Sequence, residues 1–86
     1  MNRKEQTTLA ARLLGLPEDD VRKHGRIVDE DGLFYVSVPE KGGPSLLVAG
    51  DGSVLYANSS VSFRRHLEAF HRGVRTPREA FEVGEV

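Results

Sequence analysis

The chain has 86 residues, which is enough for one domain with a small core. It contains no cysteine, and this excludes a disulfide scaffold, thiolate zinc ligands and a cysteine nucleophile. The formal net charge is -1 with 29% charged residues, so bulk charge does not indicate a nucleic-acid-binding protein. No apolar run is long enough for a signal peptide or a membrane span, and we expect a soluble, cytoplasmic, single-domain protein over residues 1–86 that does not contact a membrane.

Two helices are predicted at the start of the chain. Apolar residues recur at helical spacing over residues 2–14, at Leu9, Ala10, Leu13 and Leu14. Gly15 stands where a left-handed residue commonly ends a helix. Pro17, the acidic residues after it and the basic residues before Gly25 predict a second, short helix over residues 17–24.

Two β-hairpins are predicted next, with strands over 26–28, 33–38, 45–49 and 53–57. Each hairpin has an Asp-Gly pair between two β-prone runs, at residues 31–32 and 51–52, which is typical of a tight turn. A two-residue loop at Asp51 and Gly52 would pair Val48 with Leu55 and Leu47 with Tyr56. Alternation then gives two apolar faces, one with Leu46, Val48, Leu55 and Ala57 and the other with Leu47, Ala49, Val54 and Tyr56.

A last helix is predicted over residues 61–72, capped by Ser59 or Ser60. Its buried stripe is predicted to be Phe63, Leu67 and Phe70. Residues 74–86 are interpreted as a tail that Phe81 anchors. Together the elements predict an α+β fold, a small four-stranded antiparallel sheet with the N-terminal and C-terminal helices packed on one face.

The residues that could carry chemistry do not form a recognisable catalytic set. His66 and His71 are five residues apart on one helix and point in different directions, so they do not share a metal. We interpret them as histidines of the surface or the edge of the core, and His24 as a last-turn residue of its helix. We therefore expect no enzyme activity, no metal site and no cofactor.

Three segments follow one another between residues 31 and 73: DGLFYVSVP, GGPSLLVAGDGSVLYANSS and FRRHLEAFHRG. They resemble the strand, the P-x-L-V-x-x-x-G-x-V hairpin with its Ser/Thr-rich continuation, and the C-terminal helix of the immunity protein 35 family (YrhB-like) of bacterial polymorphic toxin systems. The resemblance implies a cytosolic α+β protein that binds and neutralises a toxin domain. It transfers no contact residue to this chain.

The sequence thus favours a non-enzymatic domain that binds a protein partner, with a toxin domain as the partner that the resemblance implies. The apolar sheet face that no helix covers is the expected contact surface, and it carries either the Leu47 and Tyr56 set or the Leu46 and Leu55 set. The candidate contact residues are Tyr35, Leu47, Tyr56, Arg64 and Arg65. A self-associating homodimer of accessory role is the alternative. A small nucleic-acid-binding module is a weaker alternative, because Phe63 and Phe70 are predicted to face the core and not to stack on bases.

Overall fold

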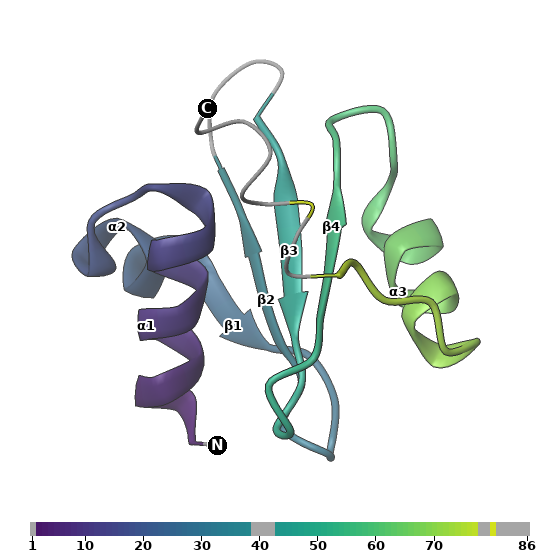
Figure 1. Cartoon of the computed structure of the whole chain (residues 1–86), viewed down its shortest axis with the longest axis horizontal. Coiled ribbons are helices and arrows are strands. Elements are labelled where there is room, and N and C mark those ends of the chain that lie inside the picture. Colours follow the sequence, from purple (N-terminus) through teal and green to yellow (C-terminus); the bar gives the residue numbers. More distant parts are fainter. Residues whose placement is uncertain (1, 39–42, 78–79, 81–86) are drawn as a thin grey trace.

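The structure is a computed structural model that describes residues 2–38, 43–77 and 80. The four strands form one antiparallel sheet in the order β1-β2-β3-β4, with two helices before it and one after it (Figure 1). The predicted α+β fold with N-terminal and C-terminal helices is therefore confirmed. The elements are α1 (Arg3–Leu14), α2 (Glu18–His24), β1 (Gly25–Ile27), β2 (Phe34–Ser37), β3 (Ser45–Val48), β4 (Val54–Ala57) and α3 (Phe63–His71).

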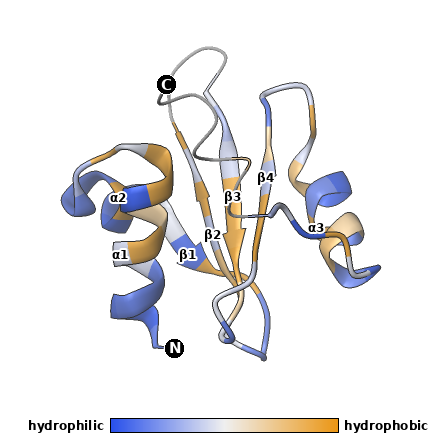
Figure 2. Ribbon diagram, in the orientation of Figure 1, coloured by the Kyte–Doolittle hydropathy of each residue, from blue (hydrophilic) through white to orange (hydrophobic). Residues whose placement is uncertain are grey.

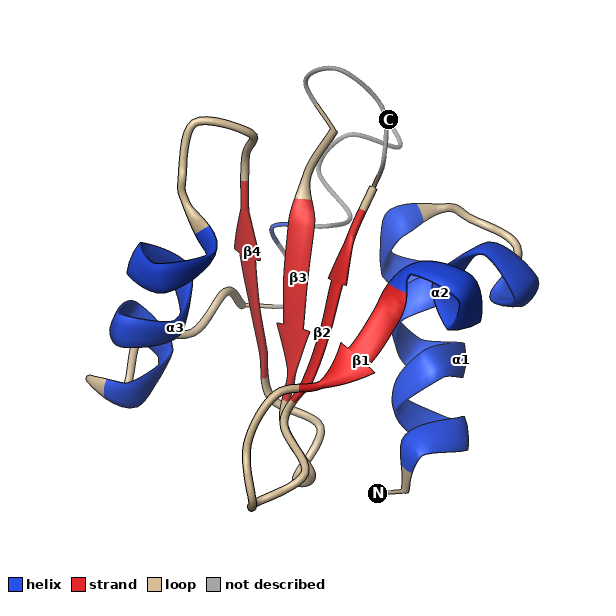
Figure 3. Cartoon of the chain, turned by 180° about the vertical axis from the view of Figure 1, so that it is seen from behind, coloured by secondary structure: helices blue, strands red, loops and turns tan. Residues whose placement is uncertain are grey.

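Helices cover both faces of the sheet, so the prediction that they pack on one face is wrong (Figure 1 and Figure 3). α1 and α2 pack on the face that carries Phe34, Val36, Leu46, Val48 and Val54. α3 packs on the opposite face, against Leu33, Leu47 and Leu55. All four residues of β3 are buried, and a strand that is apolar on both sides needs a covering layer on each.

The hydropathy of the ribbon follows this three-layer arrangement. Figure 2 shows the strands β2, β3 and β4 largely hydrophobic in the middle of the molecule, while α1, α2 and α3 carry hydrophilic segments on either side. Among the described residues, no helix is long and apolar enough to cross a membrane.

The register of the second hairpin differs from the prediction by one residue. Val48 pairs with Val54 and Leu47 with Leu55, because the loop has three residues, from Gly50 to Gly52. A two-residue type I′ loop needs positive φ at both positions, whereas Gly52 has φ 89° and no described non-glycine residue has a positive φ. The one-residue shift turns every side chain of β4 to the other face, so Leu55 lies under α3 and Val54 under α1.

α1 is fixed to the sheet by a buried amide. Its N-terminus is closed by a capping box between Asn2 and Glu5. One turn later, Gln6 is only 2% exposed, and its side-chain NH₂ donates to the carbonyl oxygens of Gly32 at 2.8 Å and Val48 at 2.9 Å. Since Gly32 precedes β2 and Val48 ends β3, this one side chain holds α1 across the same end of two strands.

α3 begins later than predicted. Ser62, and not Ser59 or Ser60, is its N-cap and accepts a hydrogen bond from the Arg65 N–H. Of the predicted stripe, Phe70 is buried, while Leu67 and Phe63 are half-buried.

The segment that follows α3 lies against the outer edge of β4. The Thr76 N–H donates to the Val54 carbonyl oxygen, and the Tyr56 N–H donates to the Thr76 hydroxyl, both at 2.8 Å. Backbone groups of an edge strand are thereby satisfied within the chain. This is the beginning of the predicted tail; the predicted anchor Phe81 lies outside the described residues.

The close approach of β1 to β2 gives a first testable prediction. A Cβ atom at Gly25 would overlap the Phe34 ring and lie 2.7 Å from the Val21 carbonyl oxygen, so we expect Gly25→Ala to destabilise the fold by about 1–3 kcal/mol. The measurement is the free energy of unfolding by urea. In the Phe34→Leu background, where the ring is gone, Gly25→Ala should cost less than in the wild type. A Gly25→Ala variant as stable as the wild type would refute this packing.

Candidate functional site

The structure separates the five candidate contact residues. Leu47 is fully buried beneath α3, and Tyr35 is half-buried at the edge of the same face. Tyr56 is 42% exposed, but its register partner Leu46 packs on the α1 side of the sheet. Arg64 and Arg65 are exposed on α3. The expected open sheet face does not exist, because α3 covers it, and Leu47 is therefore excluded as a contact residue.

Tyr35 takes part in a different arrangement, at the side of α3 that faces β1. The Tyr35 and Phe63 rings meet edge to face, with centroids 4.7 Å apart and planes at 72°. Arg26 is the register partner of Tyr35, so both side chains lie on the same face of the sheet. The Arg26 guanidinium carbon is 5.7 Å from the Tyr35 centroid and 5.2 Å from the Phe63 centroid, within the range of a cation–π contact.

We call Arg26, Tyr35, Phe63, Arg64 and Arg65 the arginine–aromatic surface. Three of its members, Phe63, Arg64 and Arg65, are consecutive in the first turn of α3. The surface is thus centred on that turn, with the β1 edge on one side. Sequence reasoning named Tyr35, Arg64 and Arg65, and missed Arg26, since only the β1–β2 register brings it beside Tyr35.

The first turn of α3 differs from those of α1 and α2 in having no acidic residue. α2 follows the order that the helix dipole favours, with acidic residues in the first turn and basic residues in the last, whereas the first turn of α1 carries Arg3 and Lys4 beside Glu5. The first turn of α3 has no acidic residue and carries two arginines, an order that costs about 0.3–1 kcal/mol at each exposed site. Arg64 is paired with Glu68 at 3.3 Å, whereas Arg65 has no carboxylate partner among the described residues.

His66 lies directly beneath this turn and is one of the most buried side chains, at 1% exposed. Its Nε2 lies 2.6 Å from the Leu55 carbonyl oxygen, which can only accept, so Nε2 carries the proton. Nδ1 is then the acceptor for the Ser45 hydroxyl at 3.3 Å. Burial lowers the pKa of His66 from its ordinary value of 6.5, and the smaller opposing effect is the hydrogen bond to Leu55.

The Ser45 hydroxyl donates to His66 Nδ1, as a catalytic serine does to its general base, but here both side chains lie in the core. Ser45 is 5% exposed, and it does not line the small cleft between β4 and α3 that His66 lines. The contact therefore orients the ring between β3 and β4. No group of three or more His, Cys, Asp or Glu side chains that could hold a metal occurs in the described part of the chain.

His66 was expected at the surface or the edge of the core, and the structure places it in the core. The signal was its spacing, because it lies three residues after Phe63 and four before Phe70, on the predicted buried stripe. His24 is exposed at the end of α2, as the sequence indicated.

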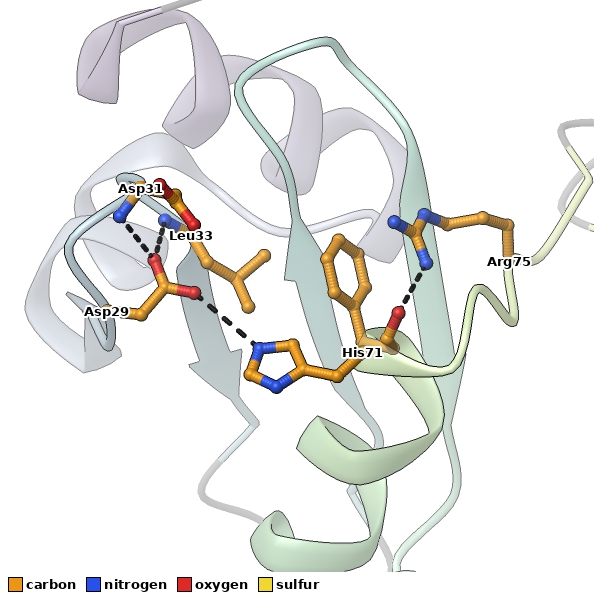
Figure 4. Close-up of polar contacts among 6 residues, drawn as sticks. Asp29, Asp31, Leu33, His71 and Arg75 are labelled. Atoms are coloured by element: carbon orange, nitrogen blue, oxygen red, sulfur yellow. Dashed lines mark hydrogen bonds and ion pairs between the residues drawn. The ribbon is translucent and has the colours of Figure 1, made fainter.

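The other end of α3 contacts both the β1–β2 turn and the segment that follows the helix. Asp29 accepts hydrogen bonds from the backbone N–H groups of Asp31 and Leu33, and its second oxygen lies 3.8 Å from His71 Nε2 (Figure 4). Arg75 donates to the Phe70 carbonyl oxygen at 2.8 Å, and its guanidinium carbon lies 3.5 Å from the centre of the Phe70 ring. α3 is thus held at its middle and its C-terminal end, while its first turn stays accessible.

Comparison of the chain with protein-family models, with curated proteins and with solved structures finds no match. The resemblance to the immunity protein family therefore rests on the three sequence segments alone.

The buried imidazole gives a second testable prediction. In the unfolded chain His66 takes up a proton near its ordinary pKa of 6.5, whereas in the folded chain its pKa is lower. The stabilisation is therefore complete above that value and is lost as the pH falls toward the folded pKa. We expect His66→Gln to be less stable than the wild type by about 1–3 kcal/mol at about pH 8, and the difference to shrink at about pH 5.

The measurement is chemical denaturation across this pH range. The matched control is His24→Gln, which changes an exposed histidine of α2 and should follow the wild-type curve. A difference between wild type and His66→Gln that is the same at both pH values would contradict a buried neutral ring.

Proposed function

We propose that the chain is a non-enzymatic protein-binding domain, an immunity-like protein that binds a partner toxin domain and neutralises it through the arginine–aromatic surface. The observation that carries the proposal is the pair of arginines in the first turn of α3, where the helix dipole opposes them, no acidic residue shares the turn, and Arg65 has no carboxylate partner among the described residues. The two arginines reduce the stability of the free protein, and a partner that brings negative charge to the first turn of α3 would offset this cost.

The composition of the arginine–aromatic surface supports a protein partner. Arginine and tyrosine are enriched among the residues that dominate binding energy at protein interfaces. Tyr35 and Phe63 already hold each other in place, so binding would not have to order them. Their rings meet at an edge and are half-buried, so they present no flat open face for a stacked base, which favours a protein over a nucleic acid.

Self-association is the second candidate. The first turn of α2 is acidic, with Glu18, Asp19 and Asp20, and all three side chains are exposed. A second copy of the chain could place this turn against the arginine–aromatic surface. Such a contact would join two different patches, so it would have to close into a ring or grow into a chain of copies.

The test first looks for a toxin gene beside this one, whose absence would count against the proposal, and then uses the encoded toxin domain with the double variant Arg26→Glu/Arg64→Glu. Both side chains are exposed, so the fold should persist. We expect binding by calorimetry to weaken at least about 30-fold, the loss of one strong interface residue, and rescue of growth in toxin-expressing cells to be lost.

The control is Lys4→Glu/Arg12→Glu, which makes the same charge change at exposed positions of α1, on the other side of the sheet. It should bind and rescue as the wild type does. Neutralisation that is equal in both double variants would refute the surface. A sedimentation coefficient that rises with concentration and falls back in Arg26→Glu/Arg64→Glu alone would favour self-association.

A further inference from the structure

A cleft of about 280 Å³ lies between β4 and α3, on the side of the helix away from Arg26. Its walls are mostly apolar, and small side chains leave the space open: Ala57 comes from β4 and Ala69 from α3. Leu55 and Val61 complete the apolar walls, and the buried His66 also lines the cleft. The volume is just below the range of sites for whole small molecules, about 300–1,000 Å³, and suits a single side chain.

Arg65 and Asn58 supply side-chain hydrogen-bond donors to the cleft, which Tyr56 also lines. Arg65 lines it and has no carboxylate partner among the described residues. Asn58 also lines it; its side-chain oxygen already accepts from the N–H and hydroxyl of Ser60, which leaves its NH₂ as the free function. No carboxylate lines the cleft. An apolar group with a negative charge beside it is therefore the chemistry that this site fits.

The cleft adjoins the arginine–aromatic surface through Arg65, which belongs to both. Phe63 contacts the β1–β2 side of the sheet and Arg65 lines the β4 side, so the first turn of α3 separates two halves of one region. Interfaces commonly seat one apolar anchor in a pocket and surround it with polar contacts. Here the cleft is the pocket, and the arginine–aromatic surface supplies the polar contacts beside it.

We propose that the cleft receives one apolar side chain of the protein partner, and that Arg65 binds a carboxylate next to that side chain in the partner's sequence. This proposal rests on the proposed function and adds to it the chemistry of the partner's contact segment: an aliphatic residue flanked by aspartate or glutamate. Arg64 on the exposed side of the same turn extends the positive charge toward the rest of an acidic segment.

The test needs no identified partner. The acetylated and amidated tripeptide Asp-Leu-Asp is titrated into the ¹⁵N-labelled full chain, with Asn-Leu-Asn and Asp-Ala-Asp as matched probes. We expect saturable shifts of the Asn58, Arg65 and Ala69 amides with a dissociation constant of about a few mM, the strength of one small anchor. Each matched probe should bind at least about fivefold more weakly, because one lacks the charge and the other the apolar side chain.

Two variants locate the binding. Ala69→Leu fills the cleft and should abolish the shifts; Arg65→Gln leaves the walls intact and should reduce binding of Asp-Leu-Asp to that of Asn-Leu-Asn. If Ala69→Leu disturbs the fold, Arg65→Gln alone decides. Non-saturable shifts, equal binding of Asp-Ala-Asp, or unchanged binding in Arg65→Gln would overturn the cleft proposal. Since Arg26 and Arg64 are untouched, that outcome would leave the toxin experiment with its double variant to decide the proposed function separately.

Discussion

The strand β3 is buried on both sides, and most of the architecture follows from this constraint. Leu46 and Val48 face α1, while Leu47 faces α3, so neither side of the sheet can be left to water. A chain of 86 residues has few elements with which to cover two faces, and it uses two helices before the sheet and one after it. As a consequence, most of the sheet surface in the described part of the chain is closed to a partner, whereas the helices, the turns and the edge residue Tyr56 are exposed.

Each helical layer is fixed to the sheet by one buried polar side chain that bonds to strand or turn carbonyls. Gln6 does this for α1, and His66 does it for α3. Apolar contacts set how much surface is buried, but they are non-directional. These hydrogen bonds are directional, and they form only when the helix lies at one position on the sheet. The buried His66 also brings the first turn of α3 close to the sheet rim, where Phe63 meets Tyr35 and Arg26. The position of the arginine–aromatic surface thus follows from how the second face is covered.

The helices, the strands and the turns between them could be predicted, because they depend on local sequence patterns. The helices and strands were predicted within one or two residues at most boundaries, because turn glycines, caps and periodicity are local signals. The face assignment of β4 was not predictable in the same way, because it depended on whether the loop at Asp51 has two or three residues. That single residue exchanged the faces of Leu55 and Val54. Both faces are apolar in either register, so the expected open face came from placing both helices on one side. The buried roles of Gln6 and His66 were missed, because their hydrogen-bond partners lie far away in the sequence and only the fold brings them together.

The central claim is that the sheet is covered on both faces, with Leu47 and Leu55 under α3 and Leu46 and Val54 under α1. Methyl-to-aromatic NOEs in a sample with labelled leucine and valine methyl groups test it most directly. The account predicts NOEs from Leu47 and Leu55 to the Phe70 and His66 rings, and none from Leu46 or Val54 to either ring. NOEs from Val54 to the Phe70 ring, with Leu55 in contact with α1, would restore the two-residue hairpin and contradict the account.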